Sequence, residues 1–255
     1  MLVTEVEDLW KRYRIPHERH LTILDHIAGA LSIFEGKRYN YEEFWVLRGV
    51  TFDVEYGDSL GIIGPNGSGK STLLKLIAGV IRLDKGRIKT NGTVVPVLEL
   101  GIGFHGDLTV KENVLVYGVL MGLSRSEIKK RTDSILEFAG LTRFQDARLR
   151  SLSSGMQVRL GFSIAIQSDP DIFLVDEALA VGDAEFQQKC LDKFREFKKE
   201  KKSILLVSHN MNLVKSFCER TLYLSSGETR FLGSSEEAAT LYTRDVKASS
   251  TFQKQ

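Results

Sequence analysis

At residues 64–71 the chain reads Gly64-Pro65-Asn66-Gly67-Ser68-Gly69-Lys70-Ser71. A strand-like apolar run, Leu60–Ile63, precedes this segment, and a helix-like run that begins at Thr72 follows it. Glycines leave the backbone N–H groups of such a loop open to a phosphate, and the following helix adds its positive N-terminal end. The pattern predicts a phosphate-binding loop in which residues 64–72 contact a nucleotide, Lys70 reaches its outer phosphates and the Ser71 hydroxyl binds Mg²⁺.

The composition of the 255 residues is that of an ordinary soluble globular protein. A formal net charge of +2 gives no support for nucleic-acid binding, and we expect none. Cys190 and Cys218 are too few for a disulfide scaffold and are expected to be buried free thiols. No apolar run reaches the ~20 residues that span a bilayer, and the acidic N-terminus does not resemble a signal peptide. We expect a cytosolic protein that meets a membrane through a partner or a surface helix.

Two kinds of strand are predicted. Val50, Phe52 and Val54 alternate with polar residues, which favours a half-exposed antiparallel strand. Short unbroken apolar runs instead favour central parallel strands with helices on both faces, and they occur at Leu60–Ile63, Ile172–Val175 and Ile204–Val207. The predicted fold class is α/β, with a mostly parallel core sheet and an antiparallel β subdomain. Asn91-Gly92 predicts a tight turn between Arg87–Thr90 and Thr93–Val97.

The middle of the chain, from about residue 103 to 168, is predicted to be an inserted α-helical subdomain. One helix is expected from Thr109 to Met121. A capping box at Ser124–Glu127 opens a second helix that Gly140 closes. A third runs from about Met156 to Gln167. These helices interrupt the parallel-sheet pattern, so we interpret them as one insertion.

A second candidate phosphate-site element is the run Ile172–Glu177, four apolar residues followed by two carboxylates. Ligands of open α/β sheets bind beyond the carboxyl ends of the strands. Asp176 fits the Mg²⁺-side carboxylate of a P-loop ATPase, and Glu177 is placed to orient and polarise the attacking water. The third element is Leu152–Met156, where Ser153 can cap a helix or contact phosphate and Gly155 permits close backbone approach.

The order of these elements resembles the nucleotide-binding domain of ATP-binding cassette (ABC) transporters over nearly the whole chain. Residues 64–71 resemble the Walker A motif, 172–177 Walker B with its catalytic glutamate, and 152–156 the ABC signature. Ala180–Asp183 resembles the D-loop, and Ser208-His209 the switch histidine. The resemblance implies a RecA-like P-loop NTPase over residues 1–240 that binds ATP and Mg²⁺. It assigns catalytic roles to Lys70, Glu177 and His209 and contacts with the nucleotide to Ser153, Ser154, Gly155 and Asp183.

The resemblance also implies a mechanism. Two copies pair head to tail, with ATP held between Walker A of one copy and the signature of the other. ATP then drives closure of the homodimer, and hydrolysis releases it. Closure supplies charge stabilisation around the γ-phosphate from both copies.

The sequence departs from the common ABC pattern in three segments, and in these segments it resembles the ATPase of bacterial polysaccharide exporters. Residues 98–105 read Leu-Glu-Leu-Gly-Ile-Gly-Phe-His where a glutamine is usual, and Glu99 is expected to take its place as a metal ligand. The other two are the signature Leu-Ser-Ser-Gly-Met and the D-loop ending at Asp183. This resemblance implies a transmembrane permease partner, lipid-linked polysaccharide as cargo, and a peripheral position on the cytoplasmic face of the inner membrane. An exporter of lipids or drugs, or a soluble ABC ATPase acting on nucleic acid, remains the alternative.

Both ends of the chain carry further predictions. Tyr13 resembles the aromatic residue that stacks on adenine, with Phe44 and Trp45 as rivals. About residues 14–44 form an insertion whose apolar positions repeat at helical spacing over Leu21–Phe34, which favours an amphipathic helix at the membrane or, alternatively, one packed on its own domain. Residues 241–255 are expected to be a polar tail with little order, so that a C-terminal carbohydrate-binding domain is either absent or cut off.

Overall fold

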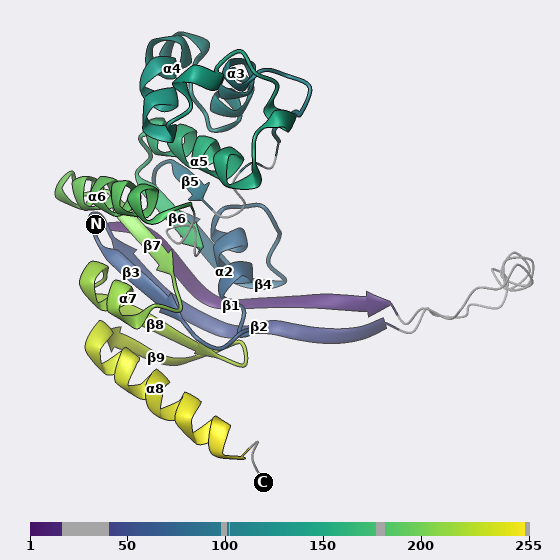
Figure 1. Ribbon diagram of the computed structural model, residues 1–255. Helices are drawn as coiled ribbons and strands as arrows, with labels where there is room; N and C mark the ends of the chain where they lie inside the picture. Colours follow the sequence, from purple (N-terminus) through teal and green to yellow (C-terminus); the bar gives the residue numbers. More distant parts are fainter. Residues whose placement is uncertain (17–40, 98–100, 102, 177–181, 253–255) are drawn as a thin grey trace, which may run out of the picture.

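The computed structural model describes residues 1–16, 41–97, 101, 103–176 and 182–252. Its strands form two sheets. A three-stranded sheet has the order β2-β1-β4, and a six-stranded sheet has the order β5-β6-β7-β3-β8-β9. The predicted fold class is confirmed, because a mostly parallel core sheet, a separate antiparallel sheet and a layer of helices are all present (Figure 1).

The antiparallel sheet consists of β1 (Leu2–Pro16), β2 (Tyr41–Glu55) and β4 (Lys85–Thr90). The inner face of β2 carries Val50, Phe52 and Val54, all buried, as the alternation predicts. The far ends of β1 and β2 project together from the body of the molecule (Figure 1). Pro16 pairs with Tyr41, so both predicted ends of the 14–44 insertion are strand rather than helix. The amphipathic helix expected over Leu21–Phe34 lies outside the described residues.

The core sheet places β3 in its centre. β3 pairs in parallel with β7 on one side and with β8 on the other, and β6 and β5 follow beyond β7. β9 is the antiparallel edge. The three predicted central strands are confirmed. The bounds are β3 Ser59–Ile63, β5 Val94–Val97, β6 Ile172–Asp176, β7 Ser203–Val207, β8 Arg220–Ser225 and β9 Glu228–Ser234.

The chain bends at Gly92, where a tight turn is predicted, but the strands that it connects belong to different sheets and do not pair with each other. β4 before it belongs to the antiparallel sheet, and β5 after it belongs to the core sheet. The Asp171 carboxylate accepts hydrogen bonds from the Thr93 backbone N–H at 2.7 Å and from its hydroxyl at 3.0 Å. The Asn91 side-chain amide donates to the Leu2 carbonyl at 2.9 Å. These bonds hold the crossing segment to both sheets.

Different elements pack against the two faces of the core sheet. Alternate residues of each strand point to opposite faces. Phe173 and Val175 of β6 pack with aromatic side chains of α6, whereas Ile172 and Leu174 pack with α2 and the antiparallel sheet. Among the described residues, the helices outside the helical layer are α2 Lys70–Ile77, α6 Ala184–Lys199, α7 Met211–Phe217 and α8 Ser235–Phe252.

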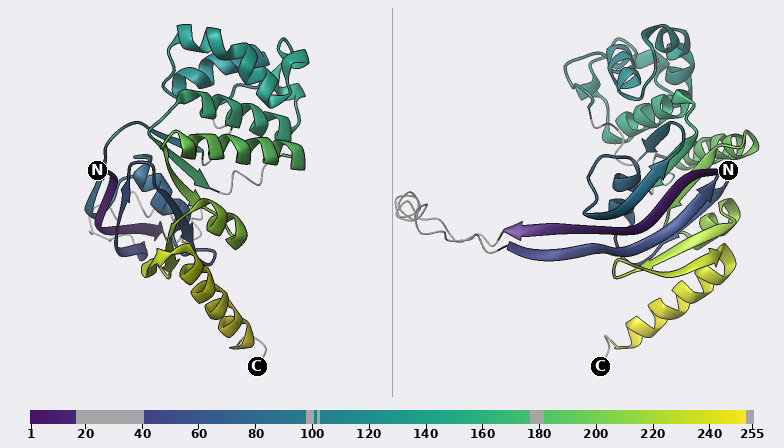
Figure 2. Two further views of the ribbon diagram at one scale, coloured as in Figure 1. Left: turned by 90° about the vertical axis from the view of Figure 1, so that its left-hand side faces the viewer. Right: turned by 180° about the vertical axis from the view of Figure 1, so that it is seen from behind.

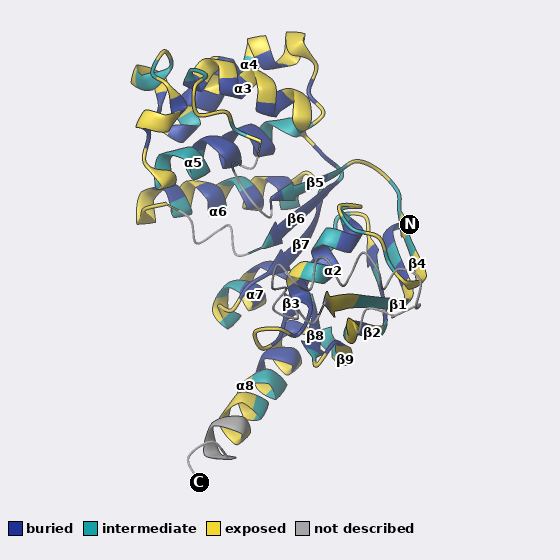
Figure 3. Ribbon diagram, turned by 90° about the vertical axis from the view of Figure 1, so that its right-hand side faces the viewer, coloured by how far each residue is buried: buried dark blue, intermediate teal, exposed yellow. Residues whose placement is uncertain are grey.

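The helical layer has a core of its own. α3 (Val110–Leu120), α4 (Arg125–Ala139) and α5 (Ser154–Ala165) lie at one end of the molecule (Figure 3). The predicted capping box is formed, since the Ser124 hydroxyl accepts from the Glu127 N–H at 3.3 Å and the Glu127 carboxylate accepts from the Ser124 N–H at 2.9 Å. Short 3₁₀ helices complete this part of the chain at Thr142–Phe144, Leu149–Ser151 and Ile166–Ser168.

The C-terminal segment differs from the expectation of a polar tail with little order over 241–255. Instead α8 continues to Phe252 and runs away from the sheet at the end opposite to the helical layer (Figure 2). Its first turns are anchored because Ala238 is buried and Tyr242 contacts Tyr223 edge-to-face at 5.5 Å. In the part of the chain that the structure describes, no helix is both long and apolar enough to cross a bilayer.

Candidate nucleotide-binding site

The glycine-rich loop connects the end of the central strand β3 with the start of α2. The backbone of Gly67 is left-handed, with φ 77°, and no atom lies within 4 Å of the point where a Cβ would stand. A side chain at Gly64 would collide with the Leu224 carbonyl and the Ser68 hydroxyl. The loop is therefore packed against β8 on one side and open on the other, which is the arrangement that a phosphate cradle needs.

Lys70 lies inside this loop. Its side chain is buried, with 7% of the residue exposed, and its ammonium donates to the carbonyl oxygens of Gly64 at 2.8 Å and Pro65 at 3.0 Å. The Ser68 hydroxyl is also buried, and no hydrogen-bond partner for it lies among the described residues. A buried polar group without a partner is costly. A bound phosphate would provide acceptors for both groups.

The core sheet brings Asp176 and His209 to the same edge as the loop. Asp176 at the end of β6 is level with Val207 of β7, which is level with Ile62 of β3. Two strand spacings separate Asp176 from the β3 end, about 10 Å. His209 follows β7 by two residues and is exposed. It shares with Pro65 and Asn66 the lining of a cavity of about 970 Å³, whose other walls come from β8, β9 and α8.

The residues proposed to hold Mg²⁺ suit that ion chemically. Mg²⁺ prefers oxygen ligands and is usually held by one or two protein groups together with phosphates and waters. Ser71, exposed in the first turn of α2, offers a hydroxyl, and Asp176 offers a partly buried carboxylate. Thr72 follows, half-buried. Glu99 and Glu177 lie outside the described residues.

The signature segment forms the exposed start of α5. Ser153 is the N-cap, and its hydroxyl accepts from the Met156 N–H at 3.3 Å. Ser153 and Ser154 are exposed, and no atom lies within 4 Å of a Cβ placed on Gly155. The N–H groups at this helix end are thus accessible to an anion from outside. The segment lies in the helical layer, whereas the glycine-rich loop lies on the core sheet (Figure 3).

Asp183 begins α6. One of its carboxylate oxygens accepts from the Phe186 N–H at 2.9 Å, and the other accepts from the Arg159 guanidinium of α5 at 2.6 Å. The Phe186 hydrogen bond, with the positive charge of Arg159, lowers the pKa of the Asp183 carboxyl. No motif in the sequence includes Arg159. Its only signal there is a positive charge in the helix that follows the signature.

The position of Tyr13 relative to the loop follows from the register of β1 and β2. A Cβ on Gly69 of the loop would meet the Leu47 side chain and the Val46 carbonyl, so β2 passes directly over the loop at these residues. Leu47 pairs with Lys11, and Tyr13 pairs with Phe44 farther along the strands. Both aromatic residues are exposed, Tyr13 at 42% and Phe44 at 51%.

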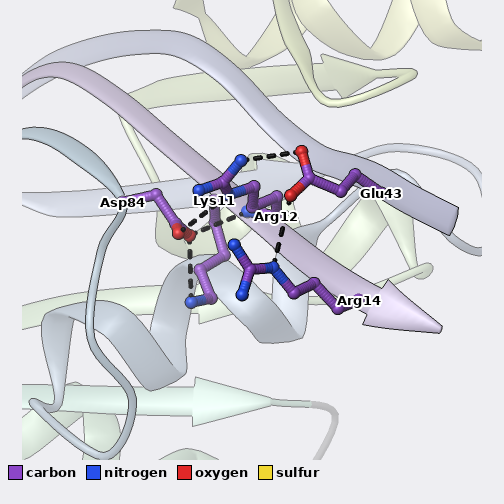
Figure 4. A network of polar contacts seen from close by, with 5 residues as sticks. All are labelled: Lys11, Arg12, Arg14, Glu43 and Asp84. Carbon is purple, nitrogen blue, oxygen red and sulfur yellow. Dashed lines mark hydrogen bonds and ion pairs between the residues drawn. The ribbon is translucent and has the colours of Figure 1, made fainter. Parts of the chain in front are cut away.

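A network of charged groups holds the strands at this point (Figure 4). Asp84 accepts from the Arg12 backbone N–H at 2.9 Å and contacts the Lys11 ammonium at 3.1 Å. Glu43 on β2 binds Arg12 at 2.7 Å and Arg14 at 3.2 Å. Burial alone would raise the pKa of the Asp84 carboxyl, but the hydrogen bonds from Arg12 and Lys11 outweigh burial and lower it.

This combination of loop, buried lysine and acidic strand end on a parallel sheet defines a P-loop nucleotide-binding protein. A family model described as "ABC transporter" matches residues 47–180. The chain belongs to that family and carries its ATP-hydrolysing cassette.

Curated relatives extend this similarity to nearly the full length. The chain is 41% identical to the O-antigen export system ATP-binding protein RfbB of Klebsiella pneumoniae, over 94% of this chain and 97% of that protein. It is 41% identical to the teichoic acids export ATP-binding protein TagH of Listeria monocytogenes serotype 4b (strain F2365), over 88% of this chain and 65% of that protein.

Solved structures support the fold. The dimeric post-hydrolysis state of the ATP-binding cassette MJ0796, bound to ADP and Pi, superposes with a TM-score of 0.71 at 22% identity. The superposition covers 91% of this chain and 98% of that one. The fold of the chain is therefore that of an ATP-binding cassette.

Proposed function

We propose that this chain is the ATP-hydrolysing subunit of a bacterial exporter that moves lipid-linked polysaccharide, such as O antigen or teichoic acid, across the inner membrane. The observation that carries the proposal is the similarity to the O-antigen export protein over almost the full length of both chains. The fold alone does not distinguish the cargo of one cassette from that of another. The chain acts as a homodimer at the cytoplasmic face of the membrane, with a separate permease.

Each residue predicted for the site has a task in this reaction. Lys70 exchanges its two carbonyl partners for the outer phosphates, and the N–H groups of residues 64–72 surround them. Ser71 and Asp176 would hold Mg²⁺, and the ion would supply positive charge to the phosphates. Glu177 orients the attacking water, and His209, on the same cavity wall as Asn66, donates to the γ-phosphate.

The separation of the two phosphate-binding elements supports the dimer. The exposed helix start at Ser153–Gly155 belongs to the helical layer, and the loop belongs to the core sheet. In a head-to-tail pair, the N–H groups of Ser154 and Gly155 meet the γ-phosphate bound by the partner's loop. ATP is then the group that joins the two copies, and hydrolysis weakens the junction.

The surface of α3 supports a permease partner. Leu115, Val116, Val119 and Leu120 are all exposed on this helix, and Leu120 is 62% exposed. Several apolar side chains gathered on one exposed helix are typical of a protein–protein contact. Because the proposed exporter needs a mechanical link to its membrane subunit, we assign this surface to a cytoplasmic helix of the permease.

The proposal is tested in the bacterium that makes the chain. Deletion of its gene should remove the exported glycan from the cell surface, and the wild-type chain should restore it. Purified Glu177→Gln should bind ATP, fail to hydrolyse it and accumulate as an ATP-bound dimer. A deletion strain with normal surface glycan but altered lipid or drug export would replace the proposed cargo. Normal ATP hydrolysis by Glu177→Gln would contradict the role of that residue.

A further inference from the structure

One ion pair connects the helix that carries the signature with the segment that begins α6. Arg159 lies six residues after Ser153, about 9 Å along the axis of α5. Its guanidinium contacts the Asp183 carboxylate at 2.6 Å, and Asp183 is the N-cap of α6. The same chain segment, six residues earlier in sequence, contains Glu177. The pair thus links the signature helix, which in the proposed dimer meets the ATP of the partner copy, with the start of the helix that follows Glu177 in sequence.

Aromatic packing fixes the direction of this link. Phe186, in the first turn of α6, contacts Phe162 of α5 at 5.8 Å and Phe138 of α4 at 5.7 Å, both edge-to-face. The Arg159 guanidinium lies 5.5 Å from the centre of the Phe186 ring. Its Nε is buried and has no hydrogen-bond partner among the described residues. The ring face and Asp183 therefore determine where this guanidinium lies.

We propose that Arg159 is a positioning residue that makes the signature helix and Asp183 at the start of α6 move as a single unit within one copy. When Ser153–Gly155 engage the ATP of the partner copy, the ion pair carries Asp183 into the dimer interface with them. Without the ion pair, the signature can engage ATP while Asp183 is not brought into the dimer interface. This inference rests on the proposed function, because it needs the head-to-tail dimer.

If the ion pair served stability alone, breaking it would change the melting temperature and not turnover or dimerisation. The Asp183 side chain is 58% exposed in this pair, and exposed ion pairs contribute little to stability. Asp183 also keeps its hydrogen bond from the Phe186 N–H when Arg159 is removed, so α6 keeps its cap. The effect of breaking the pair should therefore appear in turnover and dimerisation, and not in the melting temperature.

The test uses purified full-length protein with Arg159→Ala, Arg159→Lys, Asp183→Asn and the double variant Arg159→Ala/Asp183→Asn. Asn still caps a helix but cannot form the ion pair. We expect kcat of either single variant to fall about 10- to 100-fold, because small misplacements of a catalytic assembly cost that much. ATP affinity of the separate copies should stay within about twofold. Arg159→Lys should recover part of the rate, and the double variant should be no slower than the worse single variant.

The matched control is Arg195→Ala, which breaks an exposed ion pair of the same type with Asp192 within α6. Its kcat should equal that of the wild type. If Arg159→Ala also keeps wild-type kcat, or if the two single losses multiply in the double variant, the inference is wrong. Two other results would contradict the proposed function and not this inference. In the first, the wild type does not hydrolyse ATP. In the second, Ser153→Asp leaves hydrolysis and ATP-dependent dimerisation unchanged.

Discussion

The ammonium of Lys70 lies 2.8 Å from the carbonyl oxygen of Gly64, the first residue of the loop that Lys70 ends. The lysine therefore braces the loop from within, and the same charge is close to the place where phosphates are proposed to bind. A buried ammonium needs partners in every state of the protein. Here the carbonyl oxygens of Gly64 and Pro65 fill that role.

Lys70→Met should reduce ATP affinity by about 10- to 100-fold, the usual loss for one charge-assisted hydrogen-bond partner. The neutral side chain can remain buried, so the fold should survive. The measurement is the rise in melting temperature on adding ATP, which the variant should lose. Lys75→Met on the same helix is the control. An equal ATP-induced shift in both variants would contradict the role of Lys70.

Val119→Asp should weaken binding of the permease by about tenfold or more, because it places a charge in the centre of the exposed α3 surface. ATP hydrolysis by the isolated subunit should not change. Co-purification of the tagged permease measures the effect. Lys130→Asp on the exposed side of α4 supplies the comparison. The assignment of the surface fails if the two variants retain equal amounts of permease.

The cysteines should resist alkylation in the folded protein. Burial raises the pKa of the Cys190 thiol to about 12, and burial together with the Glu219 charge raises that of Cys218 to about 12. At about pH 8 the reactive thiolate is then on the order of one part in ten thousand. Mass spectrometry after iodoacetamide treatment should find both unmodified in buffer and both modified in urea. Rapid labelling in buffer would show that the helices open.

The capping boxes of α3 and α4 should make stability fall with acid. Hydrogen bonds from Ser124 lower the pKa of Glu127, and those from Thr109 lower the pKa of Glu112. The pKa of each carboxyl is thus lower in the folded protein than its unfolded value of about 4.3. Such a carboxyl adds stability above about pH 4.3, and this stability is lost as pH falls through the folded pKa. Glu112→Gln/Glu127→Gln should flatten melting temperature against pH in this range. Glu200→Gln, outside both boxes, should keep the wild-type slope.

The elements predicted from sequence are those whose signals are local. Leu60–Ile63 shows by its unbroken apolar run that both faces of the strand are covered, and Ser124 with Glu127 contains a complete helix start within four residues. The bend at Gly92 is equally local. The pairing of the strands on either side of it is not a local property. No residue near Gly92 indicates that β4 pairs with β1 and that β5 pairs with β6. Choice of strand partner depends on the whole sheet.

Two features of the structure are not predictable from local sequence, for physical reasons. The segment after residue 241 looks polar, yet α8 is anchored by a few contacts such as Tyr242 on Tyr223, which a composition count cannot weigh. Arg159 was overlooked because its importance depends on Asp183, 24 residues later, across two helices. At the nucleotide site, residues 64–72, Asp176 and His209 do converge, as their positions after parallel strands predict. The roles of Glu99 and Glu177 remain predictions.

The place of β3 between β7 and β8 has a consequence for how the protein is made. The ribosome releases β3 and the loop after it long before both neighbours of that strand, which lie at Ser203–Val207 and Arg220–Ser225. Until β8 has emerged, the backbone of β3 has an open edge on at least one side, which favours aggregation and slows folding. Translation must thus pass β8 before the phosphate cradle can take its shape.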